Sequence, residues 1–188
     1  MRKTTATVVL LLTAMLIAGC STLSAVGAML GSQVTFTQPQ LQQSLNRNFP
    51  KRYEKLGGLV TLNLMNPRLS IPHGDTRLRL DFDVAFAGPG SSDATTPSGR
   101  FALTSALRFD PGTRGLHLQN PTIEHVDVPA LGGVMNSTSR QLLNSWLEDY
   151  SRQEPVYRFD NTLLDRLSGR RISSTQIERG VVVVNLGN

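Results

Sequence analysis

The 188-residue chain contains a single cysteine, Cys20. A disulfide needs two cysteines, and the usual thiolate zinc sites need at least two, so the composition excludes both within one chain. Long hydrophobic runs are also scarce. The main one, from Val8 to Ile17, is shorter than the ~20 residues of a membrane-spanning helix. The sequence therefore predicts a domain that folds without cross-links and does not span a membrane.

Signals of enzymes and of nucleic-acid binding are missing as well. No serine stands in the Gly-x-Ser-x-Gly or Ser-x-x-Lys setting of a hydrolase nucleophile, and no histidine has the spacing of a helix-borne zinc site. Basic runs do not exceed two residues, as in Arg170 and Arg171. We therefore expect a protein that is not an enzyme, holds no metal or cofactor, and binds no nucleic acid.

Two groups of residues leave alternatives open. His117 and His125 lie on one predicted strand on either side of a suspected bulge, so they could converge on a metal, but a pair of surface histidines is expected. Asp81 and Asp83 share a strand face, as an acid and a base would. Arg79 lies on that same face, which favours a solvated, charge-balanced surface.

The start of the chain has the pattern of an export signal. Arg2 and Lys3 precede the apolar run, which ends on small residues up to Gly19, and this order is typical of a secretory signal peptide. The letters "IAGC" resemble the lipobox of bacterial lipoproteins. That resemblance implies cleavage between Gly19 and Cys20, diacylglyceryl and acyl chains such as palmitate on Cys20, and, with Ser21 instead of aspartate, the periplasmic face of the outer membrane. The alternative is an ordinary signal peptide with an incidental cysteine.

We divide the chain into a signal peptide at 1–19, a lipidated N-terminus and flexible tether at 20–33, and one periplasmic domain at 34–188. The tether is inferred from its small and polar residues. Loss of the signal removes Arg2 and Lys3 and reduces the 19 Lys and Arg residues to 17, against 14 Asp and Glu. The mature protein is therefore only weakly basic and long enough to bury a core.

Alternation of apolar and polar residues predicts four successive strands at 59–71, 76–86, 100–109 and 116–128, with bulges near Asn66 and Asn120. Strands that follow one another through turns form an antiparallel meander. One face of its two central strands is apolar, and its residues are Leu78, Leu80, Phe82, Val84, Phe86, Phe101, Leu103, Leu107 and Phe109. That face is expected to be buried.

A period of 3.6 residues predicts a long helix over 131–150, whose apolar face includes Met135, Leu142 and Trp146. Shorter elements complete the prediction. In chain order they are a strand at 34–37, a helix capped by Thr37 and stopped by Pro50, a strand at 156–159, a helix capped by Asn161 and ended by Gly169, and a hairpin over 171–187.

The order of these elements carries a resemblance to a known family. The lipobox, "TQPQLQQSLNRNFP", "LRLDFDVAF", "RFDPGTRGLHLQNPTIEHVDV", "PVYRF" and "GVVVVNLG" together resemble the YceB-type bacterial lipoproteins over essentially the whole mature chain. That family is similar to the tubular lipid-binding (TULIP, BPI-like) proteins, in which a curved antiparallel sheet wraps around one long helix. The resemblance implies an α+β fold of this kind with a shorter N-terminal helix.

The resemblance also implies a function. Apolar ligands of TULIP proteins lie between sheet and helix, so a phospholipid or fatty acid would occupy a groove lined by the nine strand residues above together with Met135, Leu142 and Trp146. We expect an outer-membrane lipoprotein that carries or senses such a ligand. The alternative is a structural or interaction lipoprotein with a closed core and a protein partner in the envelope, and a minor one is a hydrolase without recognisable motifs.

The anchor leads to a direct prediction. Cys20→Ala removes the sulfur that would carry lipid, so the protein should lose labelling by radioactive palmitate and leave the outer-membrane fraction of a Gram-negative host. Ser21→Asp is the matched control, which should keep the label but move the protein to the inner membrane. Palmitate labelling of the Cys20→Ala protein would contradict the lipobox interpretation.

Overall fold

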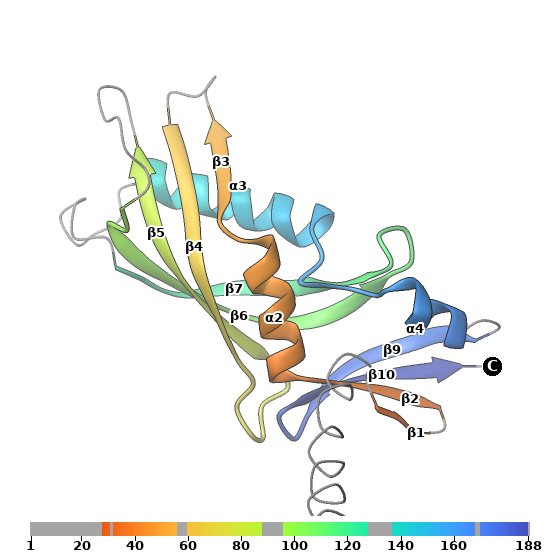
Figure 1. The fold of residues 1–188 in the computed structure, drawn as a ribbon. Coiled ribbons are helices and arrows are strands. Elements are labelled where there is room, and N and C mark those ends of the chain that lie inside the picture. Colours follow the sequence, from red (N-terminus) through yellow and green to blue (C-terminus); the bar gives the residue numbers. More distant parts are fainter. Residues whose placement is uncertain are drawn as a thin grey trace, which may run out of the picture.

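The computed structural model describes residues 28–30, 32–55, 60–87, 96–127, 137–167 and 170–187. Within these ranges the chain forms two antiparallel sheets and three helices (Figure 1). The α+β class predicted from the sequence is therefore confirmed.

The larger sheet has six strands, and its middle four form the predicted meander. The strand order is β3-β4-β5-β6-β7-β8, with bounds β3 (Lys51–Lys55), β4 (Val60–Ser70), β5 (Leu78–Ala87), β6 (Gly99–Asp110), β7 (Gly115–Asp127) and β8 (Tyr157–Arg158). The sheet is strongly twisted. Figure 1 shows that β4 and β5 run across the direction of β7. β3 was not predicted, since its sequence "KRYEK" has no apolar alternation.

Both predicted bulges are present. The pairing of β4 with β5 shifts between Met65 and Arg68, and Asn66 has a φ of 48°. The pairing of β6 with β7 shifts between Thr104 and Ala106, opposite Asn120, whose φ is 49°. Asparagine tolerates this left-handed conformation better than most residues. The bulges locally increase the twist of the sheet.

The smaller sheet joins the two ends of the described chain. Its order is β1-β2-β10-β9, with bounds β1 (Ala28–Leu30), β2 (Gln33–Thr37), β10 (Val181–Gly187) and β9 (Arg171–Glu178). The predicted hairpin turns at Arg179 and Gly180, which both have positive φ. The predicted tether at 20–33 overlaps this sheet, because β1 and the first residue of β2 are paired strand residues.

Two short helices are held by N-terminal caps. Helix α2 (Gln38–Asn48) follows Thr37, whose backbone N–H donates to the Gln40 side chain at 2.8 Å, as the sequence indicated. Helix α4 (Asn161–Arg166) was predicted to be capped by Asn161, which is wrong by one residue. The cap is Asp160, whose carboxylate accepts a hydrogen bond from the Leu163 N–H at 2.7 Å.

Helix α3 (Ser137–Gln153) matches the later part of the long helix predicted at 131–150 and extends three residues beyond it. Residues 128–136, including Met135, lie outside the described ranges, as does the side chain of Leu142. Leu143, Trp146, Leu147 and Tyr150 of α3 are buried. Their spacing places them along one face of the helix.

Most residues predicted to line a ligand groove lie in the packed core. Seven of the nine strand residues are at most 2% exposed, while Phe86 and Phe109 are partly buried. The ring centroid of Trp146 lies 5.9 Å from that of Phe82 and 6.0 Å from that of Phe101. Around Trp146, described side chains therefore fill the space between sheet and α3 where the groove was predicted.

Helix α2 closes the same side of the core. The ring of Phe49, at the C-terminal cap of α2, lies 5.2 Å from Phe82 and 5.9 Å from Tyr150 of α3. Both helices thus pack on the buried face of the larger sheet. The sequence pattern had assigned this face to the long helix alone.

One polar atom in this core is unsatisfied. The Tyr150 side chain is 4% exposed, and its hydroxyl has no hydrogen-bond partner in the described part of the chain. Burial raises the pKa of this hydroxyl, so it stays protonated. We predict that Tyr150→Phe increases the free energy of unfolding by about 1 kcal/mol, because it removes a buried donor that has lost its water.

Tyr53→Phe is the matched control, since the Tyr53 hydroxyl donates to the Asp149 carboxylate. The same deletion of one oxygen should there reduce the free energy of unfolding by about 1 kcal/mol. Urea unfolding of both variants measures the two changes. A loss of stability in Tyr150→Phe equal to that in Tyr53→Phe would contradict the assignment of an unsatisfied hydroxyl.

Candidate functional site

A cavity of about 840 Å³ lies between the end of β6, helix α4 and strand β9. Figure 1 shows α4 above β9 at the end of the molecule that lies away from β3, β4 and β5. Small-molecule sites commonly have volumes of ~300 to 1,000 Å³. This cavity is therefore the candidate functional site.

The unequal lengths of β5 and β6 create the space that the cavity occupies. β5 pairs with β6 only as far as Leu78 opposite Ser105, so residues 106–110 of β6 have no β5 residue beside them. β9 is likewise an edge strand, which pairs with β10 in the described chain. β6 and β9 approach each other, and α4 lies beside them. The cavity thus borders the edges of two sheets.

Apolar side chains from all three elements form a continuous wall. They are Leu107, Phe109, Pro111, Leu164, Leu167 and Ile172. The ring of Phe109 is held in place by stacking on Phe159, with centroids 5.2 Å apart and planes at 27°. Leu107 and Phe109 are the two predicted groove residues that line this cavity. They face α4 and β9 here, whereas the prediction had placed α3 opposite them.

The remaining lining residues are polar, and the charged ones are all cationic. They are Arg108, Gln119, Arg170, Arg171, Ser173, Ser174 and Thr175. Among these described residues no carboxylate lines the cavity. The hydroxyl oxygen of Thr175 is buried and has no hydrogen-bond partner in the described part of the chain. The cavity therefore combines an apolar wall with a margin of guanidinium, amide and hydroxyl groups.

Arg108 is already engaged by neighbouring groups. Its Nη1 lies 3.0 Å from a carboxylate oxygen of Asp110, and its Nη2 donates to the Ser151 carbonyl at 3.3 Å. The Arg108 guanidinium, helped by the backbone N–H groups of Thr113 and Gly112, holds the pKa of Asp110 below its ordinary value.

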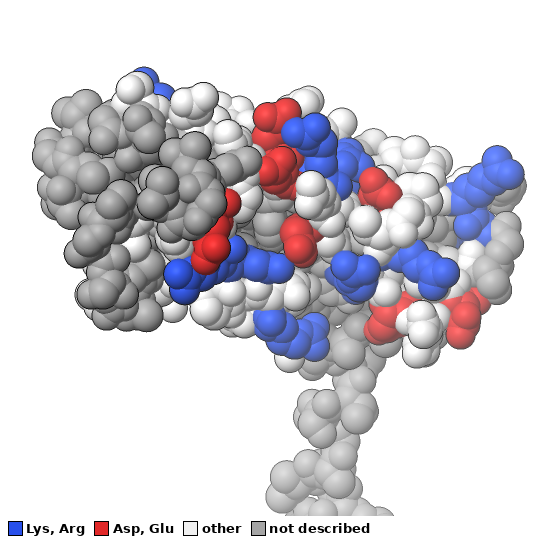
Figure 2. Space-filling view, turned by 90° about the horizontal axis from the view of Figure 1, so that it is seen from above, with Lys and Arg blue, Asp and Glu red and all other residues white. Residues whose placement is uncertain are grey.

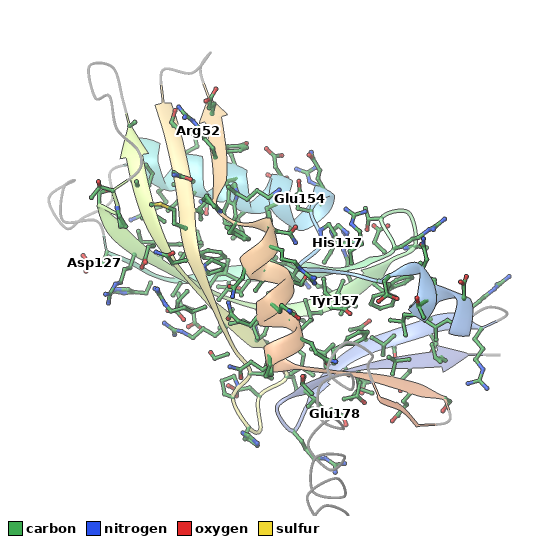
Figure 3. All side chains as sticks on the ribbon, in the orientation of Figure 1. Arg52, His117, Asp127, Glu154, Tyr157 and Glu178 are labelled. Atoms are coloured by element: carbon green, nitrogen blue, oxygen red, sulfur yellow. The ribbon has the colours of Figure 1, made fainter. Side chains whose placement is uncertain are left out.

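His117 links this end of the larger sheet to α3. Its side chain is fully buried, its Nδ1 lies 3.2 Å from the Ser151 carbonyl, and its Nε2 lies 2.6 Å from the Thr113 hydroxyl. A carbonyl can only accept, so Nδ1 carries the proton and the neutral Nε2 accepts from Thr113. Figure 3 shows His117 near the end of α3.

The sequence predicted that His117 and His125 both lie on the surface. This is wrong for His117, which is buried, whereas His125 is exposed. In register His117 lies opposite Arg108, and His125 lies opposite Ala102. Within the described ranges, no three His, Cys, Asp or Glu side chains lie close enough together to hold a metal ion.

The predicted charge-balanced surface is confirmed. Arg79 contacts Asp81 at 3.0 Å and Glu124 at 2.9 Å, and Arg68 contacts Asp83 at 2.9 Å. The Arg68 guanidinium holds the pKa of Asp83 below its ordinary value. Figure 2 shows acidic and basic side chains interspersed on the face it presents. A second cavity of about 330 Å³ has Arg79 and Glu124 of these ion pairs among its lining residues.

Several predicted site residues cannot be placed. Gly19, Cys20 and Met135 lie outside the described ranges, and for Leu142 only the backbone is described. Of the described helices, none is long and apolar enough to cross a bilayer.

Sequence reasoning missed the α4 and β9 side of the cavity. The stretch 163–172 contains Leu164, Leu167 and Ile172 interleaved with the basic pair Arg170 and Arg171, which is an amphipathic signal. That signal alone could not be tied to a site, because it does not show which strand edge these residues meet.

Burial of His117 makes the free energy of unfolding depend on pH. Burial lowers its pKa below the ordinary value of 6.5, because it disfavours the charged ring more than the Ser151 carbonyl favours it. The unfolded chain then takes up a proton at a higher pH than the folded chain. The contribution of neutral His117 to the free energy of unfolding is fully present above pH 6.5. It is lost as the pH falls below that value, by up to ~1.4 kcal/mol per pH unit.

Urea unfolding at several values between about pH 8 and about pH 5 measures this slope. The His117→Gln variant should lose less stability over that range than the wild-type protein does. Exposed His125 provides the control, and His125→Gln should leave the slope unchanged. Equal slopes for wild type and His117→Gln would contradict the prediction.

No protein-family model matches the chain, and no curated protein matches it significantly. Membership of the YceB-type lipoproteins therefore stays a prediction from the sequence pattern.

Proposed function

We propose that this protein is a lipoprotein, anchored through Cys20 to the periplasmic face of the outer membrane, whose domain binds the acyl chain of a lipid. The observation that carries the proposal is the cavity of about 840 Å³ and its apolar wall on β6, α4 and β9. We therefore place the proposed binding site at the edges of the two sheets. The sequence had instead predicted a groove between the larger sheet and the long helix.

The physical basis of binding is the hydrophobic effect. Each methylene that leaves water for an apolar surface contributes ~0.8 kcal/mol, so an acyl chain of moderate length needs few directional contacts. Buried neighbours support the wall from behind, since Leu163 and Phe159 are at most 4% exposed. Such a preformed surface reduces the entropy lost on binding.

The anchor gives the proposal its biological setting. A protein with several acyl chains on Cys20 stays at the membrane, and its domain then samples the lipids and other apolar molecules of that surface. The resemblance to TULIP proteins agrees with a lipid ligand, although a fold by itself is a weak argument for function. Whether the protein carries or senses the lipid depends on how fast it exchanges.

The full-length lipidated protein, reconstituted in phosphatidylcholine vesicles, can be tested with a photoactivatable lipid that bears a diazirine near the end of its acyl chain. Peptide mass spectrometry then maps the adducts. We expect them to concentrate on β6, α4 and β9. Leu164→Trp should reduce them by about tenfold, because an indole that displaces two methylenes of the chain removes ~1.6 kcal/mol of binding.

Val126→Trp is the matched control. Val126 is partly buried on β7 and does not line the cavity, so the same increase in volume there should leave the adducts unchanged. Far-ultraviolet circular dichroism verifies that both variants fold. Adducts spread evenly over the surface, or unaffected by Leu164→Trp, would contradict the proposed function.

The close packing of Trp146 against Phe82 and Phe101 favours a second candidate function. A core closed at this point suits a structural lipoprotein that binds an envelope protein through its polar surface. Cross-linking in cells would then capture a defined protein partner, and the lipid probe would leave the cavity unlabelled.

A further inference from the structure

We infer that the domain takes its lipid from the same membrane leaflet in which Cys20 is anchored, and does not collect it from a second membrane. The inference rests on the proposed function, because it names the source of the lipid for the same cavity. Its basis is the small number of residues and strands that separate Cys20 from the cavity.

The tether is shorter than the sequence predicted. The sequence assigned residues 20–33 to it, and fourteen residues would reach ~50 Å when fully extended. In the structure, β1 begins at Ala28 and pairs with β2. Ala28 follows Cys20 by eight residues, so its backbone lies at most ~29 Å from that of the anchor. A flexible chain of this length has an average end-to-end distance of only ~16 Å.

The register of the smaller sheet places the start of β1 close to the cavity. Ala28 pairs with Thr35 of β2, which pairs with Val183 of β10. Val183 pairs in turn with Gln176 of β9, and the neighbouring Thr175 lines the cavity. Three strand spacings of ~4.8 Å therefore separate Ala28 from this side of the cavity, or ~14 Å in total.

These distances keep the cavity near the bilayer. A domain of about 160 residues has a diameter of roughly 40 Å, so the tether is shorter than the domain is wide. Figure 1 shows the smaller sheet and α4 at one end of the molecule and the tips of β3, β4 and β5 at the other. The cavity thus lies at the end nearer the anchor, where lipids of the anchoring leaflet have the highest effective concentration.

The test compares two arrangements of the full-length lipidated protein and one probe, a diacyl phosphatidylcholine that bears a diazirine near the end of one acyl chain. In the first arrangement, the probe and the protein share the same vesicles. In the second, the protein is in probe-free vesicles, which are mixed with vesicles that contain the same amount of probe. After a brief incubation, we expect adducts on β6, α4 and β9 to be at least about tenfold more abundant in the first arrangement.

A longer tether provides the second measurement. Insertion of a Gly/Ser segment of about twenty residues between Ser24 and Ala25 should reduce the cavity adducts in shared vesicles about sixfold. The reason is that effective concentration falls roughly as the −3/2 power of tether length.

The matched control carries the same Gly/Ser segment between Thr96 and Pro97, which are exposed and do not line the cavity. This insertion leaves the tether unchanged, so its cavity adducts should equal those of the wild-type protein. Far-ultraviolet circular dichroism verifies that both insertion variants fold.

The outcomes separate the two proposals. Equal labelling of the cavity in both arrangements would overturn the same-leaflet source and leave lipid binding intact. An insertion after Ser24 that leaves the cavity adducts unchanged would overturn it as well, because the tether would then not position the cavity. Absence of cavity adducts in every arrangement would overturn the proposed function itself.

Discussion

The contact of Trp146 with Phe82 and Phe101 fixes α3 on the buried face of the larger sheet. The indole lies edge-on to both rings, at 5.9 and 6.0 Å, and so holds α3 against the buried face of the larger sheet. Aromatic rings bury large apolar areas, and Phe49 of α2 adds another to the same cluster. The candidate cavity is lined by other residues, at the end of β6 and on α4 and β9.

At the end of β6, unequal strand lengths produce the candidate site. β6 continues past the last residue that pairs with β5, and the edge of the smaller sheet approaches it through β9. Apolar residues of α4 cover part of the opening, as a sheet with one apolar face requires. The cavity is thus a consequence of how two sheets meet, and its wall comes from segments more than fifty residues apart in the sequence.

Several arginines form ion pairs on the larger sheet. Arg68, Arg79 and Arg108 are held by carboxylates of their own sheet and stabilise its surface. Arg170 and Arg171 line the cavity beside α4 and β9. His117 is buried, and its two ring nitrogens join the β6–β7 hairpin to α3.

The sequence by itself determined the features that depend on near neighbours. These include the buried face of β5 from Leu78 to Val84, the bulge at Asn66 and the helix that follows Thr37, because side-chain alternation and local backbone preferences are set within a few residues. Tertiary structure decided the rest. Strand β3, the burial of His117 and the partners of Leu107 and Phe109 all depend on contacts between distant segments, and local periodicity carries no information about which strand edges meet in space.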